Sequence, residues 1–143
     1  MKIFTIGFTK KTAEEFFTRL RENGVNRIVD VRLNNTSQIA GFAKSRDLAY
    51  FLRTIADIDY THITALAPTQ DILDDYKKKG PWIEFERRFS QILEKRRIAD
   101  TMSKKLLDGD CLLCSEDKHE HCHRRLITEY LQDHWEDVEV VHL

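Results

Sequence analysis

Asp110-Cys-Leu-Leu-Cys-Ser-Glu-Asp-Lys-His-Glu-His-Cys-His-Arg-Arg125 is the stretch of sequence that decides the fold. A short apolar run, Cys111 to Cys114, gives way to a polar loop over 115–121, and a helical pattern follows from Cys122 to about His134. A buried strand that leads through a loop into a helix is the repeating unit of α/β proteins. The stretch also holds all three cysteines and three of the six histidines, so it is the first place to look for chemistry.

The same alternation of strand and helix continues on both sides of this stretch. We expect further strands at 2–6, 27–32, 60–63 and 138–142, helices at 11–23, 46–58, 71–79 and 82–101, and irregular loops at 33–44 and 65–70. Compact β-branched runs such as 27–32 are typical of strands buried on both faces of a parallel sheet. The sequence therefore predicts one α/β domain over residues 1–143, with three layers in which helices flank a mostly parallel sheet.

Composition restricts the class of protein. The chain has 143 residues, 41% hydrophobic and 33% charged, which is enough apolar material for one packed core. Its 23 basic and 24 acidic residues leave a formal charge of −1, which argues against a nucleic-acid partner. No apolar run approaches the roughly 20 residues of a membrane helix, and the N-terminus lacks a signal-peptide layout. We expect a cytoplasmic protein with reduced cysteines and no membrane partner, and the oligomeric state is left open.

Polar side chains collect where the expected strands end. Gly7, Asp30, Arg32, His62 and the segment 114–116 all fall at or just after a strand exit. The carboxyl ends of parallel strands meet at one edge of a sheet, which is the usual place for a ligand. Asp30 and Arg32 lie two residues apart, so their side chains leave the same face of the strand. Arg32 could hold an anion while Asp30 orients it or moves a proton, and a structural salt bridge is the alternative.

The start of the last long helix carries the sharpest candidate. Cys122 at the N-cap would place its sulfur near free backbone N–H groups and beside His123, Arg124 and Arg125, all of which favour a thiolate. We therefore expect a depressed pKa for Cys122 and a nucleophilic role, with Arg124 as the partner of an oxyanion or phosphate. Glu116 is a candidate general base. The alternatives are a cysteine that simply packs and a loop carboxylate that caps a helix.

Metal binding is a second interpretation of the same stretch. Side chains suited to zinc gather there: Cys111, Cys114, His119, His121, Cys122 and His123. Residues three apart on a strand point to opposite faces, so Cys111 and Cys114 do not readily share one ion. Cys114, His121 and Cys122 survive that objection as the cluster of a metal- or thiol-dependent binding or sensor module. The spacing matches none of the usual zinc-finger layouts, so we assign no metal ligand and leave the cofactor unknown.

Five short motifs resemble the domain of unknown function 488 family. They are Thr5-Ile6-Gly7, Val29-Asp30-Val31-Arg32, Tyr60-x-His62, Leu112-Leu113-Cys114-x-Glu116 and Cys122-His123-Arg124. The motifs stand in the family's order and span nearly the whole chain. The resemblance implies a compact α/β fold whose matched positions form a shared cleft, and it implies no particular reaction.

Three loops depart from the family's pattern. Gly7-Phe8-Thr9 stands where the family tends to have Gly-His-Ser, Asn35 where it has a proline, and Ala67-Pro68 where it has a Gly-Gly pair. Lost glycines remove points at which the backbone can approach a ligand, so we expect the substrate or even the activity to differ here.

The leading functional hypothesis is an enzyme that acts on an anionic small molecule or nucleotide at the strand exits. The catalytic candidates are Asp30, Glu116 and Cys122, and the ligand-binding candidates are Gly7, Arg32, His62, Cys114, His123 and Arg124. In this hypothesis Arg32 and Arg124 anchor the anion, and a catalytic candidate moves a proton or attacks.

Overall fold

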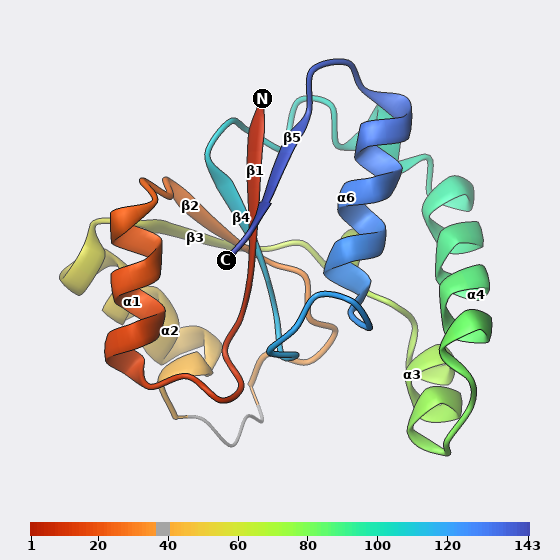
Figure 1. Cartoon of the computed structure of the whole chain (residues 1–143), viewed down its shortest axis with the longest axis horizontal. Coiled ribbons are helices and arrows are strands. Elements are labelled where there is room, and N and C mark those ends of the chain that lie inside the picture. Colours follow the sequence, from red (N-terminus) through yellow and green to blue (C-terminus); the bar gives the residue numbers. More distant parts are fainter. Residues whose placement is uncertain (37–40) are drawn as a thin grey trace.

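A computed structural model describes residues 1–36 and 41–143 of the chain, and a five-stranded sheet runs through its middle (Figure 1). The strand order is β3-β2-β4-β1-β5, and every described pairing is parallel. The strands are β1 (Lys2–Gly7), β2 (Arg27–Asp30), β3 (Asp59–His62), β4 (Asp110–Cys114) and β5 (Glu139–His142). The predicted α/β class with a mostly parallel sheet is confirmed.

Helices cover both faces of the sheet. They are α1 (Ala13–Glu22), α2 (Ser45–Phe51), α3 (Gln70–Lys77), α4 (Trp82–Lys95), α5 (Ile98–Thr101) and α6 (His123–His134). Shorter helical turns are η1 (Gly41–Ala43), η2 (Leu52–Ala56) and η3 (Thr64–Leu66). Figure 1 shows α1 and α2 on one side of the sheet, and α3, α4 and α6 on the other. The three layers follow from this arrangement.

Two hydrophobic cores, one on each face, hold the layers together, and β4 contributes to both. Cys111 and Leu113 pack with the side chains of α1 and α2, whereas Leu112 and Cys114 pack with those of α4 and α6. All four side chains are at most 5% exposed. A strand buried on both faces has no need for polar alternation, which explains the continuous apolar run in the sequence. The alternation also confirms that Cys111 and Cys114 point to opposite faces.

The long helix expected over 82–101 is two helices. α4 ends at Lys95 with Arg96 as its C-cap, Arg97 has a left-handed backbone (φ 53°), and α5 begins at the next residue. The guanidinium of Arg96 donates to the carbonyl oxygens of Ala65 and Ala67, at 2.7 and 2.6 Å, and so ties this break to the loop before α3. The sequence gives no warning of the break, because neither glycine nor proline is present there.

Two other segments differ from expectation in detail. The helix expected over 46–58 becomes π-helical at η2 and ends at Asp57, which has a left-handed backbone (φ 54°). The loop expected over 65–70 includes part of η3 and the first residue of α3. Of the irregular segment expected over 33–44, residues 37–40 lie outside the described residues.

The membrane question has a direct structural answer for the described residues. Within 1–36 and 41–143, none of the helices combines the length and the apolar character that crossing a membrane requires.

Candidate functional site

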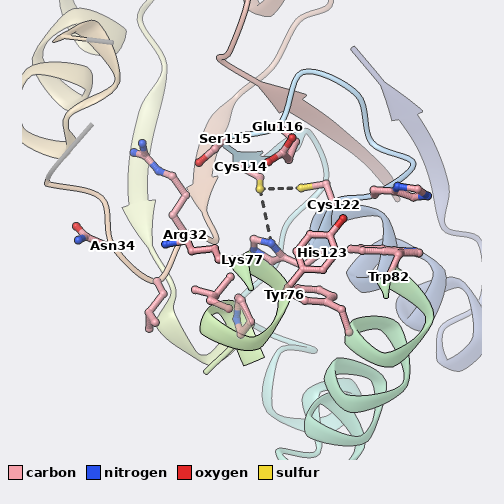
Figure 2. A pocket seen from close by; sticks show the side chains of 15 residues that line it. Arg32, Asn34, Tyr76, Lys77, Trp82, Cys114, Ser115, Glu116, Cys122 and His123 are labelled. Atoms are coloured by element: carbon pink, nitrogen blue, oxygen red, sulfur yellow. Dashed lines mark hydrogen bonds between the residues drawn. The ribbon is translucent and has the colours of Figure 1, made fainter. Parts of the chain in front are cut away.

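A cavity of about 350 Å³ lies at the carboxyl edge of the sheet (Figure 2). Its floor is the end of β4 and the start of α6, which supply Cys114, Cys122 and His123. Its wall comes from α3 and α4 and is largely aromatic. Charged and polar side chains from the strand exits and the 115–121 loop complete the lining. The volume is within the range of pockets that hold small molecules.

The cavity floor brings two sulfurs and an imidazole together. The thiol of Cys122 donates to Sγ of Cys114 at 2.7 Å, and Nδ1 of His123 lies 3.6 Å from the same sulfur. Figure 2 shows the three side chains pointing toward one another. Cys114 is the last residue of β4, Cys122 is the N-cap of α6, and His123 is the first helical residue. A parallel strand and the helix that follows it therefore assemble this cluster directly.

The imidazole of His123 is held in one orientation. Its Nε2 lies 2.7 Å from the carbonyl oxygen of Val31, which follows β2. Because a carbonyl oxygen can only accept, Nε2 carries a proton and donates it, and Nδ1 is the nitrogen that faces Cys114. The ring of Phe89 meets the imidazole edge-on, with centroids 5.6 Å apart. His123 is thus fixed as a partner for the Cys114 sulfur.

The electrostatics of the cluster favour a thiolate on Cys114. The hydrogen bond from Cys122, assisted by the nearby His123, lowers the pKa of the Cys114 thiol well below its usual value in spite of burial. Burial and the neighbouring Cys114 raise the pKa of Cys122 well above its usual value. Burial alone would lower the pKa of His123, but the negative charge of Cys114 and the hydrogen bond to it raise that pKa. The depressed pKa expected for Cys122 is therefore wrong, and the structure assigns it to Cys114.

The 115–121 loop between the two cysteines is held in place by contacts with Arg124 of α6 and with the segment that follows β1. The buried guanidinium of Arg124 donates to the carbonyl oxygens of Glu116 and Asp117. Thr9, after β1, donates its N–H to the carbonyl oxygen of Ser115 at 3.2 Å, and Lys11 forms an ion pair with Asp117 at 2.7 Å. These contacts fix the cavity rim next to the two sulfurs.

The same loop passes so close to the backbone of residue 7 that only a glycine fits there. A Cβ at this position would lie 1.5 Å from the carbonyl oxygen of Glu116 and 2.9 Å from a guanidinium nitrogen of Arg124. Only glycine allows this close approach. Gly7 pairs with Cys114 across the sheet but does not line the cavity, so its observed contribution is packing rather than ligand contact.

Arg124 does not occupy the position that its predicted role requires. It is 1% exposed, its two terminal nitrogens are engaged by loop carbonyls, and it is absent from the cavity lining. An anion in the cavity would therefore not meet its guanidinium. The sequence signal was a basic residue at a helix start, and that signal does not reveal which way the side chain turns.

Asp30 and Arg32 form the structural salt bridge that was the alternative to a catalytic pair. Nε and Nη2 of Arg32 donate to the two oxygens of Asp30 at 2.8 and 2.7 Å, and the hydroxyl of Tyr60 donates to the same carboxylate at 2.6 Å. Burial and Asp30 raise the pKa of Tyr60 above its usual value. Nη2 of Arg32 also donates to the carbonyl oxygen of Ala43 at 2.8 Å. The carboxylate is fully buried and does not line the cavity.

The strand alternation explains where this pair lies. Val29 and Val31 point into the core beneath the cavity, so Asp30 points to the other face, and the guanidinium of Arg32 lies over the ring of Phe8 at 5.2 Å. Arg32 still contributes to the cavity lining. His62 lies outside the lining, with Nε2 2.6 Å from the carbonyl oxygen of Arg32, and helps to hold this turn.

The aromatic wall is the part of the site that the sequence did not reveal. Tyr76 from α3 and Trp82 and Phe85 from α4 line the cavity, and Lys77 stands beside them. Trp82 is stacked between Phe85 and the exposed His121, with ring centroids 4.9 and 5.1 Å away. From the sequence, Trp82 and Phe85 belong to an ordinary buried helix stripe. Their position directly after the Gly80-Pro81 turn was the available signal.

Three of the floor residues could hold a metal ion. The ligand atoms of Cys114, Cys122 and His123 all lie within 4.8 Å of one another. His121, which the sequence placed in this cluster, is not part of the group and stacks on Trp82 instead. Two sulfurs and one imidazole are ligands that zinc accepts. Glu116 is exposed and lines the cavity, so its assignment as a general base stays a prediction.

Comparison with known proteins adds one positive finding. A family model described as Domain of unknown function DUF488 matches residues 12–131, which is most of the chain. The matched range includes β2, β4 and the first part of α6, and so contains the whole cavity floor. No curated protein and no solved structure matches the chain.

Proposed function

Because the chain belongs to the DUF488 family, whose description assigns no activity, we propose a function from the site itself. The protein is a thiol-dependent enzyme that acts on a small anionic molecule in the cavity, and Cys114 is its nucleophile. The observation that carries this proposal is the contact of the Cys114 sulfur with His123 on one side and Cys122 on the other. Proteins activate a cysteine by placing next to it groups that stabilise its thiolate, and here an imidazole and a second thiol do so for Cys114.

The cavity supports a ligand with a flat group. The rings of Tyr76 and Trp82 offer apolar faces on the wall, and such faces suit a planar ring or base. Lys77 and His121 supply positive or protonatable groups at the rim. Lys77 thus replaces Arg124 as the residue that favours a negative charge. Glu116 remains the candidate for proton transfer to or from the bound molecule.

Two alkylating reagents of similar size test both parts of the proposal. Iodoacetate carries a negative charge and iodoacetamide carries none. Each reacts with a thiolate by forming a C–S bond and releasing iodide. In reduced, chelator-treated protein, we expect both reagents to label Cys114, identified by peptide mass. Relative to glutathione, the rate ratio of iodoacetate to iodoacetamide should be several-fold higher for Cys114.

Matched variants separate the nucleophile from the charge. Lys77→Met should lower the iodoacetate preference, whereas Lys78→Met, one residue outside the cavity lining, should leave it unchanged. Cys111→Ala should behave as the wild type because Cys111 is buried in the opposite core. Labelling that falls on Cys122 first, or a ratio equal to that of glutathione, would contradict the proposal.

The grouping of Cys114, Cys122 and His123 supports a second candidate function, a metal-binding or sensor module. The three ligand atoms are close enough for one ion, and the fixed Nε2 of His123 resembles the outer support that metal-bound histidines usually have. Protein purified without chelator would then contain zinc or iron, and added zinc would raise the Tm of the wild type but not of Cys122→Ser. A metal-free protein with an unchanged Tm would rule out this candidate.

A further inference from the structure

We propose that Cys114 and Cys122 form a reversible disulfide when the protein meets a peroxide, with Cys114 oxidised first and Cys122 resolving the product. The disulfide would be a modification site that regulates the proposed enzyme. It rests on that function in one respect, since Cys114 is the reacting thiol in both. Disulfide formation differs from the proposed activity in that it also requires a second thiol close to the first.

The geometry already brings the two sulfurs together. Sγ of Cys122 lies 2.7 Å from Sγ of Cys114 and directs its proton toward it. A disulfide bond is about 2.05 Å long, so the sulfurs need to move by less than one bond length to join. The cysteines sit at the two ends of a loop that Arg124 and Lys11 hold in place. The approach is therefore built into the structure and does not depend on a mobile segment.

A peroxide has a route to the first sulfur. Cys114 lines the cavity, which is large enough for many waters, and a peroxide molecule is hardly larger than water. Cys111 is fully buried among the side chains that face α1 and α2, so it is neither reachable from the cavity nor near Cys122. Cys114 and Cys122 both line the cavity, and Cys114 is the sulfur that accepts from Cys122 and faces Nδ1 of His123, so it is the one that reacts first.

The chemistry balances with hydrogen peroxide as the oxidant. The Cys114 thiolate attacks one peroxide oxygen, the O–O bond breaks, and the leaving hydroxide takes a proton from Nδ1 of His123 to become water. Cys114 is then a sulfenic acid. The Cys122 sulfur attacks the Cys114 sulfur, an S–S bond forms, and the sulfenic oxygen leaves as a second water with the Cys122 proton and the proton of the acid. Two thiols lose two electrons in all, and one peroxide gains them.

The disulfide would switch the site off. Once Cys114 is bonded to Cys122 it no longer has a thiolate to attack a ligand. A dithiol reductant reverses the step by exchange and restores both thiols. The second cysteine also protects the first, because a sulfenic acid without a partner thiol can be oxidised further and irreversibly.

Intact-mass measurement on Cys111→Ala protein tests the proposal. This variant keeps only Cys114 and Cys122, so any internal disulfide has one possible pairing. After a stoichiometric dose of hydrogen peroxide, we expect the monomer to lose the mass of two hydrogens. Trypsin cuts after Lys118, between the cysteines, so the two peptides should remain linked until dithiothreitol is added. Wild-type protein should show the same loss of mass.

Two further variants test the order of the steps. Cys122→Ser should gain one oxygen at Cys114 and react there with dimedone, whereas Cys114→Ser should keep its Cys122 thiol at the same dose. Unchanged mass in wild-type protein, or equal oxidation of Cys122 in Cys114→Ser, would overturn the proposal. If no disulfide forms while iodoacetate still labels Cys114 selectively, this inference fails and the proposed function stands. If the disulfide forms but Cys114 shows no preference for iodoacetate, this inference stands and the proposed function fails.

Discussion

Nδ1 of His123 lies 3.6 Å from the sulfur of Cys114, and the other nitrogen of the ring is held by the backbone at Val31. The contact joins two residues nine positions apart in the sequence, at the end of β4 and the start of α6. It raises the pKa of His123 and helps to lower the pKa of Cys114, because a thiolate and a protonated imidazole stabilise each other. The pair therefore gives the site a pH dependence that differs from that of an isolated thiol.

Alkylation of Cys114 should persist to lower pH than alkylation of glutathione. The folded protein lowers the pKa of Cys114, so its thiolate is still populated as the pH falls below the usual range for thiols. His123→Asn removes an imidazole that favours the thiolate, so the pKa of Cys114 should rise and the iodoacetamide rate at about pH 6.5 should fall several-fold. His119→Asn, which lies outside the cavity lining, is the control. Equal pH profiles for wild type and His123→Asn would contradict the interpretation.

Arg124→Met should destabilise the protein by about 3 kcal/mol, because two loop carbonyls lose charged donors inside the protein. Urea unfolding measures this loss. The exposed Arg21→Met should change the unfolding free energy by no more than about 0.5 kcal/mol. A stable Arg124→Met protein that had merely lost its iodoacetate preference would instead support the anion-binding role predicted from the sequence.

Arg32→Met should cost about 4 kcal/mol of unfolding free energy, since it leaves the buried Asp30 carboxylate without its partner. The control is Asp100→Asn, which breaks an exposed ion pair with Arg97 and should cost less than about 0.5 kcal/mol. In conditions where Arg32→Met remains folded, its iodoacetate preference should match the wild type. A lost preference would return Arg32 to the role of anion anchor.

His142 should make the protein less stable in mild acid. Burial, with the nearby His119 and Arg124, lowers its pKa to about 4. The unfolded chain takes up the proton near pH 6.5 and the folded chain does not, so this contribution to stability falls as the pH drops from about 6.5 to 4 and then levels off. His142→Gln should flatten the plot of unfolding free energy against pH over that range. An NMR titration of the imidazole gives the midpoint directly.

The fold was predictable from the sequence because its signals are local. Apolar β-branched runs, helical stripes and the turns between them follow one another along the chain, and parallel pairing follows from their alternation. The break between α4 and α5 was not predictable, since Arg97 adopts a left-handed backbone without the glycine that usually marks one. The neighbouring Arg96 donates to carbonyl oxygens about thirty residues earlier in the chain, and such contacts are not visible in the local sequence.

The sequence was enough to predict where the cavity lies, but not how the groups that line it are arranged. Strand exits placed Cys114, Glu116, Cys122 and His123 at one edge, and these residues do line one cavity. Which sulfur becomes the thiolate depends on a hydrogen bond direction and on burial, and neither can be obtained from residue spacing. Residue spacing likewise does not predict that the Arg124 side chain turns toward the loop carbonyls.

The floor and the wall of the cavity come from separate parts of the chain. The sulfurs and imidazole belong to β4 and α6, whereas the rings of Tyr76, Trp82 and Phe85 belong to the α3–α4 segment. Substitutions in that segment can alter the shape of the wall while the sulfurs and the imidazole of the floor stay in place. A single hairpin of helices therefore sets which molecules the cavity can accept, independently of the chemistry of its floor.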